Sequence, residues 1–71
     1  MDEGLTSKLG IVRDFNRRTL AVRITLDEGG IAKCLLSVYD SGGPRRPPEV
    51  GARVKVLYKE GLLLQVRRLL D

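Results

Sequence analysis

Residues 19–26 read T-L-A-V-R-I-T-L, and this stretch decides the fold class of the chain. Its larger apolar side chains, Leu20, Val22, Ile24 and Leu26, alternate with small or polar ones. Successive side chains of a β-strand point to opposite faces, so this period of two is typical of a strand with one buried face. An amphipathic helix would need apolar residues three and four positions apart. We therefore predict a strand whose four apolar residues face inward.

Four further segments with apolar, β-branched character flank this strand. They are residues 8–15, 31–39, 54–58 and 62–69. Turn-forming residues separate most of them, at positions 16–18, 27–30 and 59–61. Gly10 lies inside the first segment and predicts a bulge or a sharp bend there. The chain therefore reads as five short strands.

Two segments lie outside this pattern. Residues 1–6 are polar and short, and we predict a loose tail. Residues 40–51 contain three Pro and three Gly, which excludes both a helix and a regular strand. We expect this segment to be a long irregular connector on the surface.

The alternation also predicts which side chains of the later strands face the core. The expected inward residues are Ala32, Cys34, Leu36, Val38, Val54, Val56, Tyr58, Leu62, Leu64 and Val66. Three apolar residues are expected to face outward instead: Leu35, Leu57 and Leu63. If Leu57 and Leu63 pair across the last hairpin, they form an exposed patch that suits a protein partner or a homo-oligomer. The alternative is a change of face caused by a single bulge.

A chain of 71 residues forms one domain with a small core. Five strands are too few for a good sandwich, whereas closing them into a barrel pairs every edge. We predict an all-β domain over residues 1–71, a small five-stranded antiparallel barrel without a regular helix. Three hairpin-linked strands, a long connector and one more hairpin suit both OB-like and Sm- or Tudor-like barrels. A terminal helix over residues 62–70 is the less favoured alternative, because it would lose the pairing with residues 54–58.

Composition limits the partners and the compartment. Thirteen basic residues against nine acidic ones give a formal charge of +4, which favours anionic partners such as nucleic acid or a membrane surface. A merely solvated basic surface is the alternative. Cys34 stands alone, so no disulfide framework is expected. No apolar run approaches the length of a membrane span and residues 1–3 are unlike a signal peptide, so we expect a reducing, cytoplasmic setting.

No catalytic constellation is visible in the sequence. The chain contains no His, and no Ser or Cys has an evident base beside it. One Cys without His excludes a structural zinc site, and no acidic segment has the spacing of a calcium loop. We expect a non-enzymatic binding module without a cofactor.

The basic side chains are the most useful functional signal. Some lie in predicted turns or in the connector, and others project outward from predicted strands, where they could together follow a phosphate backbone. Tyr39 could offer a stacking surface for a base. The predicted nucleic-acid-binding residues, for single-stranded DNA or RNA, are Arg17, Arg18, Arg23, Lys33, Tyr39, Arg45, Arg46, Lys55 and Arg67. The Pro-rich segment 43–48 could alternatively dock as polyproline II, although a stiff loop is the favoured reading.

The last hairpin carries a family resemblance. Gly51-Ala52-Arg53-Val54-Lys55-Val56 and Glu60-Gly61-Leu62-Leu63-Leu64-Gln65-Val66 resemble the closing hairpin of OB-type barrels, with a G-x-x-V-x-V entry and a G-x-x-L-x-V return. The C-terminal domain of NfeD-like membrane proteins is similar in the same hairpin, which covers about a third of the chain. The resemblance implies a small β-barrel and assigns no functional residue.

Overall fold

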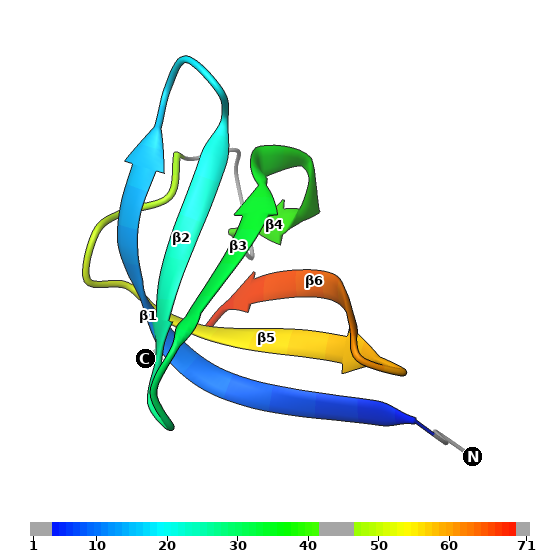
Figure 1. The fold of residues 1–71 in the computed structure, drawn as a ribbon. Coiled ribbons are helices and arrows are strands. Elements are labelled where there is room, and N and C mark those ends of the chain that lie inside the picture. The colour runs from blue at the N-terminus through cyan, green and yellow to red at the C-terminus, as the bar shows by residue number, and fades with distance from the viewer. Residues whose placement is uncertain (1–3, 42–46, 70–71) are drawn as a thin grey trace.

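The computed structural model describes residues 4–41 and 47–69 and is all-β, with no regular helix in those ranges. Six strand segments and one short 3₁₀ turn follow one another along the chain (Figure 1). Their bounds are β1 Leu5–Asn16, β2 Ala21–Leu26, β3 Ile31–Leu35, η1 Leu36–Val38, β4 Tyr39–Asp40, β5 Arg53–Lys59 and β6 Leu62–Arg68. Arg45 and Arg46 lie outside the described residues.

The long, curved strand β1 belongs to both halves of the sheet (Figure 1). Its first part, from Leu5 to Ile11, pairs antiparallel with β5, and its later part, from Gly10 to Asn16, pairs antiparallel with β2. The tail predicted over residues 1–6 is therefore too long, because Leu5 and Thr6 already pair with β5. A bulge or a sharp bend was expected at Gly10; the bulge lies instead between Val12 and Asp14.

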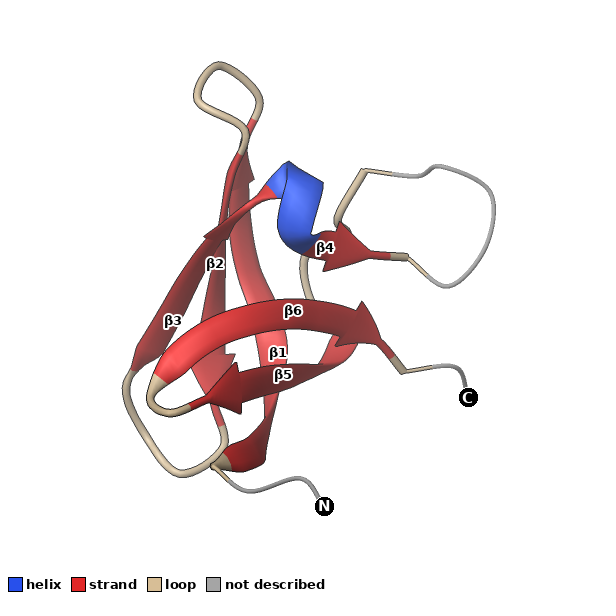
Figure 2. Ribbon diagram, turned by 90° about the vertical axis from the view of Figure 1, so that its right-hand side faces the viewer, coloured by secondary structure: helices blue, strands red, loops and turns tan. Residues whose placement is uncertain are grey.

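The sheet curls so that its two edge strands are consecutive segments of the chain. The strand order is β3-β2-β1-β5-β6-β4. Strands β3 and β4 are the two edges, and only η1 separates them in sequence. Figure 2 shows β6 arching over β5 and ending beside β4, with which it pairs in parallel through Tyr39 and Val66. The result is a half-barrel of six strands.

The expected third strand, residues 31–39, is broken in two. The chain leaves extended geometry at Leu36, makes one 3₁₀ turn and becomes extended again at Tyr39. Leu36 and Val38, expected to face inward on a strand, therefore lie in the turn, where Val38 still packs against the core. This break accounts for six strand segments where five strands were predicted.

The core lies on the concave side of the curled sheet. Its largest fully buried side chains are Val12, Val22, Ile24, Val54, Val56 and Val66. The strand predicted over residues 19–26 begins only at Ala21, and Leu20 lies in the preceding turn with 46% of its surface exposed. The prediction that Leu20 faces the core is therefore wrong, whereas Val22, Ile24 and Leu26 are buried as expected.

The last hairpin changes face part-way along β6. Strands β5 and β6 are joined by Glu60 and Gly61, both with positive φ, as a tight hairpin turn requires. The pairing passes from Leu57–Gln65 to Tyr58–Leu63, so one residue, Leu64, is left over as a bulge. Leu62 and Leu64 are 72% and 51% exposed, and Leu63 packs against the core. These three residues therefore lie on the faces opposite to those predicted, because a single bulge changes the face, which was the alternative interpretation of this hairpin.

Candidate functional site

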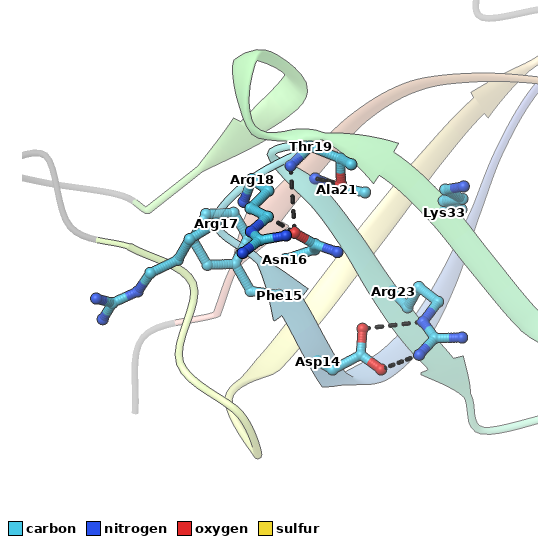
Figure 3. A pocket seen from close by; sticks show the side chains of 9 residues that line it. All are labelled: Asp14, Phe15, Asn16, Arg17, Arg18, Thr19, Ala21, Arg23 and Lys33. Carbon is cyan, nitrogen blue, oxygen red and sulfur yellow. Dashed lines mark hydrogen bonds and ion pairs between the residues drawn. The ribbon is translucent and has the colours of Figure 1, made fainter.

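Four of the predicted basic residues lie around one hollow of about 630 Å³. The turn between β1 and β2 supplies Arg17 and Arg18, and the outer faces of β2 and β3 supply Arg23 and Lys33 (Figure 3). Arg23 and Lys33 are direct cross-strand neighbours. The remaining lining residues are Asp14, Phe15, Asn16, Thr19 and Ala21. Sequence reasoning placed these cations in separate turns and strands, and the fold of β1, β2 and β3 brings them together.

The turn that carries Arg17 and Arg18 is held by hydrogen bonds. The Asn16 side-chain oxygen accepts from the backbone N–H groups of Arg18, at 2.8 Å, and Thr19, at 3.2 Å. The backbone N–H of Leu20 donates to the Asn16 carbonyl at 2.7 Å, and the Leu20 carbonyl accepts from Leu36 at 2.8 Å. Asn16 stabilises the turn through its side-chain acceptor, and Leu20, not Asn16, holds the positive φ of 62°.

One of the four cations is already paired inside the hollow. Arg23 donates from Nε to Asp14 Oδ1 at 2.9 Å and from Nη2 to Asp14 Oδ2. These hydrogen bonds hold the pKa of the Asp14 carboxyl below its ordinary value and raise the pKa of Arg23. Arg17, Arg18 and Lys33 make no ion pair with any residue that the structure describes. The hollow therefore keeps a net positive charge.

The four basic side chains of the hollow do not all point the same way (Figure 3). In Figure 3 the Arg17 side chain extends away from Arg23 and Lys33, whereas Asp14 and Arg23 point toward one another. Arg17 also lines a second, neighbouring hollow. An extended ligand on Arg18 and Lys33 would therefore meet Arg17 at the boundary between the two hollows.

Two other predicted phosphate contacts lie elsewhere on the sheet. Lys55 and Arg67 are cross-strand neighbours on β5 and β6, in the other half of the curled sheet. Arg67 Nε lies 3.9 Å from Asp40 Oδ2, so part of its charge is balanced. The structure brings Lys55 and Arg67 together but separates them from the hollow around Arg23.

Tyr39 does not line the basic hollow but lines the second hollow beside it. It is the first residue of β4 and is half-buried against the core. Phe15 and Arg17 line the second hollow with it. Its hydroxyl is buried and has no hydrogen-bond partner in the part of the chain that the structure describes. Burial raises the pKa of the Tyr39 phenol, which keeps it neutral. Tyr39 thus offers a ring rather than a charge.

The three apolar residues predicted for a protein interface do not form one patch. Leu35 is exposed at the end of β3, and Leu63 packs against the core. Leu57 is half-buried on the outer face of β5, where Ser7 is opposite it and Leu5 and Leu9 are its diagonal neighbours on β1. The apolar outer surface is therefore built on Leu5, Leu9 and Leu57.

Cys34 is buried on the inner face of β3, as its position in the alternation predicts. Burial raises the pKa of its thiol, so less of the reactive thiolate forms at neutral pH. We expect a thiol reagent to modify Cys34 only as fast as the domain opens, and to react at once in denaturant. Fast labelling of the folded protein, followed by absorbance, would contradict this placement.

Sequence reasoning missed two residues of the hollow. Asp14 was not singled out, although its carboxylate neutralises Arg23. Phe15 was not among the predicted site residues; it packs against the core and also lines both hollows. The bulge between Val12 and Asp14 puts the Asp14 carboxylate beside Arg23 and turns Phe15 inward. In the sequence, Leu9, Ile11 and Phe15 share one face of the alternation and Val12 breaks it, which hints at a change of face without marking the extra residue.

Residues 4–41 and 47–69 hold no cluster of three or more His, Cys, Asp or Glu side chains suited to a metal ion. They also hold no helix with the length and apolar character needed to cross a membrane. The chain matches no known protein family, and comparison with curated proteins and with solved structures gives no significant match.

Proposed function

We propose that this protein is a non-enzymatic module that binds single-stranded nucleic acid through the basic hollow between β1, β2 and β3. The observation that carries the proposal is the convergence of Arg17, Arg18, Arg23 and Lys33 around one concavity that also contains an aromatic side chain, Phe15. Cations that follow a groove beside an aromatic surface suit a phosphate backbone with exposed bases.

The sheet topology supports an OB-type barrel rather than an Sm- or Tudor-type one. In this proposal η1 completes the barrel wall by joining the edge strands β3 and β4, and β4 extends the path of β3 into a parallel pairing with β6. OB-type barrels bind oligonucleotides on the face of their second and third strands and on the loop between the first two. Arg23, Lys33 and the Arg17-Arg18 turn occupy those positions.

The test is a titration of a short labelled single strand at several salt concentrations. Three unpaired cations predict that log K falls with log salt with a slope of about −2 for a single strand. Amide shifts in a parallel NMR titration should centre on residues 14–23 and 33. Binding that is absent at low salt, or that does not depend on salt, would contradict the proposal.

Removing the carboxylate from the hollow should strengthen binding. Asp14→Asn releases Arg23 from its ion pair and so adds one phosphate contact, which predicts an affinity about five- to tenfold higher at low salt and a steeper slope by about 0.7. Asp27→Asn is the matched control, because Asp27 pairs with Arg53 at 3.1 Å outside the hollow. Equal gains from the two variants would point to net charge alone.

A protein-interaction or assembly module is the second candidate. The observation in its favour is the apolar outer surface at Leu5, Leu9 and Leu57, together with the exposed Leu62 and Leu64. It predicts a dimer or larger species in light scattering that Leu9→Asn dissolves. A strict monomer at high concentration would remove the homo-oligomer form of this candidate.

A further inference from the structure

A second hollow, of about 850 Å³, lies where three separate parts of the chain meet. The β1–β2 turn supplies Leu20, η1 supplies Leu36 and Ser37, and β4 supplies Tyr39. Phe15, Arg17, Ser41 and Pro47 complete the lining. The hydrogen bond from the Leu36 N–H to the Leu20 carbonyl, at 2.8 Å, ties the turn to η1. The walls are therefore aromatic and aliphatic on a fixed backbone, with polar groups among them.

Leu20 is the wall residue with a strained backbone. Its φ of 62° places a leucine in the left-handed region, which costs free energy for any residue with a branched side chain. Its side chain is also exposed rather than packed in the core. The backbone of Leu20 holds the turn through its hydrogen bonds to Asn16 and Leu36, but its strained, exposed side chain adds little to the core, and such outliers gather at ligand sites.

The apolar hollow adjoins the basic one. Phe15 and Arg17 line both of them. A ligand that suits both hollows carries an anionic group at one end and a flat aromatic ring at the other. Each nucleotide of a single strand carries both, whereas a duplex keeps its rings stacked inside. A single-stranded nucleic acid is therefore the occupant whose charge and exposed rings match the two hollows.

We propose that the second hollow accepts an unstacked nucleobase, between Phe15, Leu20 and Tyr39, while the basic hollow holds the adjoining phosphates. This inference rests on the proposed nucleic-acid binding and adds what that proposal lacks, a site for the base. Stacking on aromatic rings tolerates every base, so the hollow gives a preference for exposed bases rather than for a sequence.

The first experiment compares oligothymidylate with an abasic strand of the same length and charge. Both should bind with the same salt slope, and the base-bearing strand should bind about tenfold more tightly. The chain has two tyrosines and no tryptophan, so Tyr58→Phe leaves Tyr39 as the single emitter. Its emission should be quenched by oligothymidylate and not by the abasic strand.

The second experiment changes the wall. Leu20→Asn relieves the left-handed strain, because Asn tolerates that region, and should raise the unfolding temperature slightly while it reduces the preference for the base-bearing strand to about twofold. Leu62→Asn is the matched control, an equally drastic change at an exposed leucine outside both hollows. It should leave the preference unchanged.

The outcomes separate the two proposals. Equal affinity for both strands, with a normal salt slope and no tyrosine quenching, would overturn the base site and leave the basic hollow intact. Absence of salt-dependent binding to either strand would overturn both. A higher affinity for duplex than for single strand would overturn the base site, because duplex bases cannot enter the hollow.

Discussion

Replacing Gly10 by alanine is expected to destabilise the domain by about 2–3 kcal/mol, because an added Cβ would meet closer atoms there than at any other glycine that the structure describes. A Cβ at Gly10 would lie 2.7 Å from Ile24 Cγ2 and 2.7 Å from the Thr25 carbonyl oxygen. Neither atom can move easily, because Ile24 is fully buried and the carbonyl belongs to the backbone of β2. Gly10 pairs with both Leu26 and Val54, so any shift disturbs both halves of the sheet.

Urea unfolding followed by circular dichroism measures this loss. A domain of this size has a free energy of unfolding of roughly 4–10 kcal/mol, so the variant should lose a large fraction of it. Ser7→Ala, at an exposed position of the same strand, serves as the control and should change the stability by less than about 0.5 kcal/mol. A loss below about 1 kcal/mol for Gly10→Ala would mean that β1 and β2 are not packed as closely as described.

The double variant Arg17→Ala/Arg18→Ala should lose about 50-fold in affinity for a single strand at low salt. Each unpaired cation contributes about 0.7 to the salt slope, so the slope should fall from about −2 to about −0.7. The fold should persist, because both side chains are exposed in a turn whose hydrogen bonds use Asn16 and the backbone. Fluorescence anisotropy at several salt concentrations gives the affinity and the slope together.

Lys55→Ala/Arg67→Ala is the matched control for this experiment. It removes the same two charges from the β5–β6 half of the sheet. At about 0.1 M salt the Debye length is about 10 Å, so charges outside the hollow are largely screened and we expect less than about a threefold loss at that salt. If both double variants lose affinity equally, the interaction depends on the overall charge of +4 and not on the hollow.

In the described residues, the side chains that stabilise the domain differ from the exposed cations that are available for binding. The six fully buried side chains at the centre of the core are aliphatic. Arg17, Arg18 and Lys33 are exposed and unpaired within the described ranges, and Leu20 is strained. The variants at Arg17, Arg18 and Leu20 should therefore remain folded, because these residues lie outside the core.

Residues 19–26 alone were enough to predict the all-β class, because a period of two has no helical interpretation. The hairpin turns at residues 27–30 and 60–61 followed from their glycines and polar residues, and the inward positions Val22, Ile24, Val54, Val56 and Val66 are confirmed. These features are local: they depend on which residues alternate and on where the chain can turn.

The faces of the outer segments could not be predicted in the same way. An extra residue in a strand reverses every side chain beyond it, and nothing in the sequence marks Arg13 or Leu64 as the extra one. Pairing with the neighbouring strand decides the bulge, so Leu63 faces the core and Leu62 faces outward. The same limit applies to Leu20, whose position in the turn depends on hydrogen bonds to Asn16 and Leu36.

The sequence by itself determined that the chain forms a small all-β domain with basic side chains on its outer surface and aliphatic ones inside. Only the tertiary structure decided which basic side chains meet. Arg17, Arg18, Arg23 and Lys33 come together because β1, β2 and β3 are neighbours, while Lys55 and Arg67 lie in the other half of the curled sheet. A period of two assigns a face to each residue, but the neighbour across the sheet depends on strand order and register, which are properties of the whole fold.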